Sequence, residues 1–134
     1  MLTLSAAQAM LEAGLARARD GKHRVTIAIV DSGGFVVAMA RMDGAAPATP
    51  DIALGKAGAA ALMRRPSGEL GQRWAPGAPI PTAMAIRTGG RFIAHQGALP
   101  FLEGDQAIGA VGVSGAPSDQ DEAIAQAAID AFRP

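Results

Sequence analysis

The chain has no cysteine and no tyrosine, and only four phenylalanines and one tryptophan among its 134 residues. Without cysteine there can be no disulfide framework and no thiolate metal site. Lysine plus arginine and aspartate plus glutamate both number 12, so the formal net charge is zero. A protein that binds the phosphate backbone of a nucleic acid needs an excess of basic residues, and we therefore expect no nucleic-acid partner.

Long apolar runs are also absent. The longest nearly apolar run, residues 53–63, is interrupted by Lys56 and is too short to span a bilayer. Near the start of the chain, Glu12 interrupts what would have to be the apolar core of a signal peptide. We therefore expect no membrane partner and a cytoplasmic location, which the missing cysteines also favour.

Apolar residues nevertheless make up 49% of the chain, which is enough to build a core and excludes a disordered polypeptide. The length suits one domain, and no linker, low-complexity tract or internal repeat divides the sequence. We therefore predict a single domain over residues 1–134.

Three segments show the spacing of amphipathic or buried helices. Thr3 or Ser5 can cap a first helix that stops at Gly21. Thr49 is the predicted N-cap of a second helix, and Ser118 is the predicted N-cap of the last one. Acidic residues follow Ser118, and they suit the positive end of the helix dipole.

Five strands are predicted between these helices, with tight turns at the glycine pairs 33–34 and 89–90. The predicted strands cover residues 25–30, 35–41, 82–88, 91–95 and 107–113. Residues 67–81 are predicted to be loop-like, with at most one short helical turn. Because hairpins join most of the strands, we predict a mainly antiparallel five-stranded sheet with helices packed on it, an α+β domain.

Lys56 is the most informative single residue, because it is the only charged side chain from Ala53 to Met63. A helix that is apolar all round must be covered on several sides, and we expect the sheet and a second copy of the chain to cover it. A buried ammonium group needs a partner. Lys56 is therefore either a ligand-anchoring cation or base, or one half of an ion pair with Asp31 or Asp43.

Five further positions carry groups that could serve a site. Asp31 could act in proton transfer, or simply accept hydrogen bonds from the turn that follows it. Arg41 could orient a carboxylate through two hydrogen bonds, or lie at the sheet margin. His95 closes a predicted strand and could face a pocket. Backbone N–H groups around Ser114 and Gly115 could cradle an anion, or the glycine could only allow close packing.

Three segments occur together in one order and cover most of the chain: IVDSGGFVVAMARMDGA, PDIALGKAGAAAL and IGAVGVSGAPSDQDEAIA. On these segments the chain resembles the GlcG/HbpS family, which includes the C-terminal domain of PduO-type proteins. The resemblance implies an α+β sandwich-like subunit and a compact homo-oligomer, often an octamer. It also implies an association with haem binding or haem degradation, and some similar proteins are lyases acting on hydroxylaminobenzoates.

Two functions follow as hypotheses, beside a purely structural oligomer without a ligand. The first is a small ligand-binding protein for haem, or a similar planar anionic molecule, at a pocket between subunits. The second is a cofactor-free lyase or isomerase acting on a small carboxylate or an aromatic hydroxylamine. The candidate catalytic residues are Lys56, His95 and Asp31. The candidate ligand-binding residues are Arg41, Asp43, Lys56, His95, Gly97, Ser114 and Gly115. The two histidines lack metal-type spacing, so no site for a bare metal ion is expected.

Overall fold

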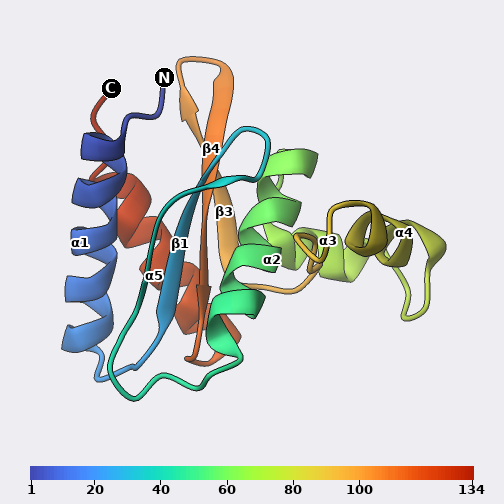
Figure 1. The fold of residues 1–134 in the computed structure, drawn as a ribbon, viewed down its shortest axis with the longest axis horizontal. Helices are drawn as coiled ribbons and strands as arrows, with labels where there is room; N and C mark the ends of the chain where they lie inside the picture. Colours follow the sequence, from blue (N-terminus) through green and yellow to red (C-terminus); the bar gives the residue numbers. More distant parts are fainter.

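A computed structural model describes residues 1–134 (Figure 1). Its strands form one four-stranded sheet in the order β2-β1-β4-β3. All neighbouring strands are antiparallel. The predicted α+β class with an antiparallel sheet is confirmed, but the sheet has four strands and not five. The elements are α1 (Leu4–Asp20), β1 (Thr26–Asp31), β2 (Val36–Arg41), α2 (Thr49–Met63), α3 (Ser67–Arg73), α4 (Pro79–Arg87), β3 (Ala98–Glu103), β4 (Gln106–Ser114) and α5 (Ser118–Asp130).

Helices cover both faces of this sheet. On one face, α1 and α5 lie side by side, and on the other face lies α2 (Figure 1). The core under α1 and α5 contains large apolar side chains such as Met10, Ile27 and Ile124. The core under α2 is built mostly of alanine, and a Cβ at Gly112 would collide with the Ala53 carbonyl. Small residues therefore let α2 approach the backbone of the central strands closely.

The predicted second hairpin is wrong. Residues 82–87 belong to α4 and Thr88 is its C-cap, residues 91–95 form no strand, and the partner of β4 is β3. A short apolar stretch fits either a helix or a strand, and neighbouring prolines at its start favour a helix. The strand β3 was not predicted, because it contains Pro100 and proline lacks the N–H that a central strand needs. As β3 lies at the sheet edge, that loss is tolerated.

The predicted helix caps are confirmed only at the first helix. There, the Thr3 hydroxyl accepts a hydrogen bond from the N–H of Ala6 at 3.1 Å. Thr49 is the first residue of α2 rather than its cap, and its hydroxyl is hydrogen bonded to that of Thr26 at 2.8 Å. Ser118 likewise begins α5 without capping it. The hydroxyl of Thr49 is hydrogen bonded to Thr26, and that of Ser118 donates to the side chain of Gln96. Local sequence patterns do not reveal such partners from distant segments.

The outer side of α2 is covered by the same chain. The N–H of Ile93 donates to the Gly55 carbonyl at 2.9 Å, and a Cβ at Gly58 would collide with the Arg91 carbonyl. The segment around residues 91–95 thus packs directly on the helix. Lys56, on another side of the helix, is 2% exposed within the single subunit. Burial of α2 therefore does not itself require a second copy.

A small arm made of α3 and α4 extends away from the sheet beyond α2 (Figure 1). No residue of α4 is buried, and the side chain of Ile86 is 76% exposed. None of the five helices combines the length and the apolarity that crossing a bilayer requires.

Candidate functional site

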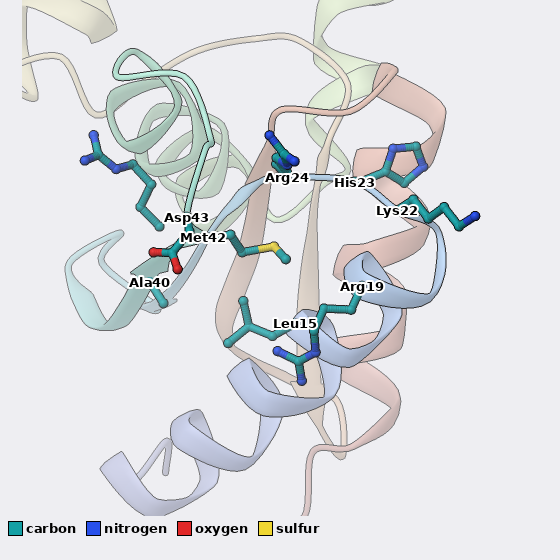
Figure 2. Close-up of a pocket in the computed structure, with 9 residues that line it drawn as sticks. Leu15, Arg19, Lys22, His23, Arg24, Ala40, Met42 and Asp43 are labelled. Carbon is teal, nitrogen blue, oxygen red and sulfur yellow. The ribbon is translucent and has the colours of Figure 1, made fainter.

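An open pocket of about 580 Å³ lies where α1 ends and β1 begins, next to the end of β2 (Figure 2). Helix α1 contributes Leu15 and Arg19, the connection to β1 contributes residues 22–24, and the end of β2 contributes residues 40–43. Leu15, Ala40 and Met42 are apolar, whereas the remaining lining side chains are charged or ionisable. The pocket therefore joins an apolar surface to polar groups drawn from separate segments.

The turn after α1 places the middle segment of this pocket. The N–H of Lys22 donates to the Arg19 carbonyl at 3.0 Å, and the N–H of His23 donates to the Ala18 carbonyl at 2.9 Å. Lys22 adopts a φ of 59°, a left-handed conformation that usually belongs to glycine at this position of a helix end. The chain thus reverses within two residues and brings three basic side chains, at positions 22–24, to the pocket.

The pocket has a strong local excess of positive charge. Arg19, Lys22, Arg24 and Arg41 line it with a single carboxylate, that of Asp43. None of these five side chains forms an ion pair or a side-chain hydrogen bond. The ion pairs of the structure are Met1–Glu103, Lys56–Asp121 and Arg65–Glu69. Unpaired cations around a concave surface attract anionic ligands, although the chain as a whole has no net charge.

Lys56 lies outside this pocket, in a closed cluster between α2, β4 and α5. Its Nζ donates to the Val113 carbonyl at 3.0 Å and forms an ion pair with Asp121 Oδ2 at 3.2 Å. Both side chains of this pair are 3% exposed. The ion-pair partner of Lys56 is therefore Asp121, and the predicted partners Asp31 and Asp43 are wrong.

Asp121 completes the cluster at the start of α5. Burial raises the pKa of Asp121 above its ordinary value, because the interior strips water from the carboxylate. The hydrogen bond that Oδ1 accepts from Ala116 at 2.9 Å opposes this rise, as does the positive charge of Lys56. The carboxylate is satisfied on both oxygens, so the cluster fastens α5 to the sheet and presents no atom to a ligand.

Glycine and serine candidates surround this cluster and the neighbouring strand end. A Cβ at Gly97 would lie 2.6 Å from Lys56 Nζ, and the residue has a φ of 138°, so only glycine fits beside the ammonium group. Ser114 is buried and pairs with Thr26 across the sheet. A Cβ at Gly115 would collide with the Arg24 carbonyl, so this glycine packs against the backbone of the pocket segment.

Asp31 and His95 lie apart from both groups. Asp31 Oδ1 accepts hydrogen bonds from the N–H groups of Gly33 and Phe35 at 2.9 and 3.0 Å, in the turn between β1 and β2. His95 is exposed and lines none of the pockets. The structure therefore brings Arg41 and Asp43 together at the open pocket, and Lys56 and Gly97 together in the buried cluster.

Sequence reasoning missed the residues that α1 and the following turn contribute to the pocket. The available signal was the segment RARDGKHR, residues 17–24, in which five of eight side chains are basic or histidine. At a helix C-terminus such residues also complement the helix dipole, which makes the signal ambiguous in the sequence alone. No group of three or more His, Cys, Asp or Glu side chains gathers in the structure as a site for a bare metal ion.

Comparisons with known proteins give consistent matches over nearly the whole chain. The model of a family described as "Haem degrading protein HbpS-like" matches residues 2–130. Protein GlcG of Escherichia coli strain K12 is 35% identical over 114 residues, which cover 85% of this chain and 81% of that protein. The crystal structure of Klebsiella pneumoniae protein ORFY has a TM-score of 0.87 at 36% identity, covering 98% of this chain and 90% of that one. The crystal structure of a PduOC:haem complex has a TM-score of 0.86 at 28% identity, and the match covers 98% of this chain and 95% of that one.

Proposed function

Because this chain belongs to the family of HbpS-like proteins, we propose that it binds haem or a similar planar anionic molecule in the open pocket. The observation that carries this proposal is the set of four unpaired cations beside an apolar surface: Arg19, Lys22, Arg24 and Arg41. Haem presents a flat apolar ring and carboxylates at one edge. Arginine is the side chain best suited to bind a carboxylate through two hydrogen bonds.

The residues of the pocket fit such a ligand in size and chemistry. A volume of about 580 Å³ lies within the range of small-molecule pockets, roughly 300–1,000 Å³. Leu15 and Met42 can pack against the ring, and the arginines can hold the carboxylates at the rim. When bound, haem would supply an iron atom that accepts axial ligands and changes oxidation state.

We further propose that a second copy of the chain covers the bound ligand. The pocket is open to solvent, whereas binding sites usually bury most of the surface of their ligand. Helix α4 supports self-association, because it exposes Ile80 and Ile86 and packs little against the rest of its own subunit. Exposed apolar surface of this kind usually marks a contact with another chain. A homo-oligomer, with an octamer as the expected size, is thus part of the proposed function.

Titration of the purified protein with haemin tests the binding proposal. We expect a Soret change that saturates at a fixed ratio of haemin to subunit. The triple substitution of Arg19, Arg24 and Arg41 to glutamine should weaken binding strongly. Arg87→Gln, which removes an exposed arginine of α4 outside the pocket, is the matched control and should leave the titration unchanged. Uptake that never saturates, or that is equal in the triple variant, would contradict the proposal.

A second candidate is the cofactor-free lyase or isomerase acting on a carboxylate or an aromatic hydroxylamine. The observation that favours it is that His23 and Asp43 line the same pocket as the arginines. Arginine would orient the carboxylate of the substrate, while the imidazole and the carboxylate transfer protons. Incubation with a hydroxylaminobenzoate, followed by chromatography, should show substrate loss with the wild type and none with His23→Ala. Unchanged substrate with the wild type would remove this candidate.

A further inference from the structure

We infer that Gly44 is a positioning residue of the open pocket: it seats the side chain of Arg24, which binds a carboxylate of the ligand. This inference rests on the proposed function, because it names the anchoring cation of the same site and the residue that holds this cation in place. Arg24 lies in the connection between α1 and β1 and lines the pocket (Figure 2). Gly44 follows the end of β2 and does not itself line the pocket.

The turn after β2 requires a positive φ at position 44. The N–H of Ala45 donates to the Met42 carbonyl at 3.1 Å, which closes a turn over residues 42–45. Gly44 is the third residue of this turn and has a φ of 82°. A type II turn needs such a value at its third residue, and glycine adopts it without strain. The turn accounts for the backbone of Gly44, but not for the side chain that packs on it.

The missing side chain of Gly44 leaves the space that Arg24 occupies. A Cβ at Gly44 would lie 2.9 Å from both Cδ and Nη1 of Arg24, so the arginine packs directly against the backbone of the turn. Gly104, in the turn between β3 and β4, has a comparable φ of 64°, but a Cβ there would meet nothing within 4 Å. The contact with an arginine is therefore particular to the turn after β2.

The backbone of Arg24 is held in place as well. A Cβ at Gly115 would collide with the Arg24 carbonyl, so the chain after β4 packs on the main chain of this arginine. The N–H of Met42 donates to the Val25 carbonyl at 2.9 Å, which ties the residue after Arg24 to the first residue of the turn. Both sides of the contact between Arg24 and Gly44 are therefore fixed to the sheet.

The guanidinium of Arg24 nevertheless has no partner within the protein. It forms no ion pair and no hydrogen bond, so its N–H groups are free to donate to a carboxylate of the ligand. Holding a long side chain in place before binding avoids an entropy cost worth about two- to tenfold in affinity. Arg19 and Arg41 also line the pocket, but neither packs on a glycine in this way. Arg24 is thus the pocket arginine whose place is set before the ligand arrives.

The experiment compares the affinities of haemin and haemin dimethyl ester, which keeps the ring and the iron but has no carboxylate. We expect the wild type to bind haemin about tenfold more tightly than the ester, and Arg24→Gln to lose most of this preference. Gly44→Ala should lower the preference about two- to tenfold, and should lower it no further in the Arg24→Gln background. Gly104→Ala is the matched control. It places the same left-handed strain outside the pocket, so it should lower the melting temperature as Gly44→Ala does and keep the wild-type preference.

The inference is overturned if Gly44→Ala keeps the wild-type preference, if Gly104→Ala lowers it equally, or if the wild type has no preference for haemin over the ester. An effect of Gly44→Ala that is equal with and without the Arg24 guanidinium also overturns it, because the turn then acts through another group. Gly44→Asn replaces the alanine variant if the latter fails to fold, since asparagine tolerates a positive φ and carries the same Cβ. In each of these cases, saturable binding of haemin leaves the proposed function standing. Absence of saturable binding in the wild type overturns the proposed function itself, together with this inference.

Discussion

Replacing Lys56 by methionine removes a buried charge while keeping the length and shape of the side chain. Lys56 Nζ contacts the Val113 carbonyl and the Asp121 carboxylate, and both members of the ion pair are almost completely buried. After the substitution the carboxylate of Asp121 keeps its hydrogen bond from Ala116 but loses its counter-charge. The perturbation therefore leaves an unpaired negative charge at the junction of α2, β4 and α5.

The expected cost is large for a domain of this size. Removal of one partner of a buried ion pair costs about 3–5 kcal/mol, while a whole domain is stable by about 5–15 kcal/mol. For a chain of this length, such a loss lowers the melting temperature by on the order of 10–20 °C. The double variant Lys56→Met/Asp121→Asn should recover much of the loss, because it removes both charges and keeps an oxygen for the Ala116 N–H.

The assay is urea denaturation and thermal unfolding of the wild type, the single variant and the double variant, beside a haemin titration of each. Large destabilisation of the single variant, with recovery in the double variant, identifies Lys56 as part of the scaffold. The sequence had favoured Lys56 as a ligand-binding group, and the closed hydrogen-bond set of the structure now favours the structural role. A single variant that melts within about 2 °C of the wild type but fails to bind haemin would refute this reasoning, since it falls far short of the expected shift.

Four further outcomes are expected. Lys22→Gly relieves the left-handed strain and should raise the melting temperature by a few degrees while weakening haemin binding. Arg64→Gly relieves the same strain at the end of α2 and should raise the melting temperature without changing haemin affinity. Because burial raises the pKa of Asp121, the folded state holds this proton more tightly than the unfolded chain does. Its stabilising contribution is complete below the unfolded value of 3.8 and is lost as pH rises through the raised folded value. Urea denaturation between about pH 3 and 7 should therefore show the wild type gaining stability over Asp121→Asn as pH falls. Ile86→Glu should reduce the assembly size measured by light scattering if α4 contacts a second copy, and an unchanged mass would exclude that contact.

The sequence alone determined those elements whose signals lie within a few consecutive residues. Helical spacing indicated α1, α2 and α5, and the glycine pair 33–34 between two apolar runs indicated the hairpin of β1 and β2. Periodicity and turn residues act over short distances, so they suffice for such elements. The family segments likewise indicated the α+β class, and they included Arg41 and Asp43, which line the open pocket.

Tertiary structure decided which distant segments meet, because that choice depends on packing between elements and not on local spacing. Pro100 can belong to a strand only because β3 is at the edge of the sheet, and residues 82–87 are helical outside the sheet. Lys56 finds its partner 65 residues away in Asp121. The left-handed turn at Lys22 brings the end of α1 beside the end of β2, and the pocket forms between them. Basic side chains from separate segments of the sequence therefore gather around one cavity.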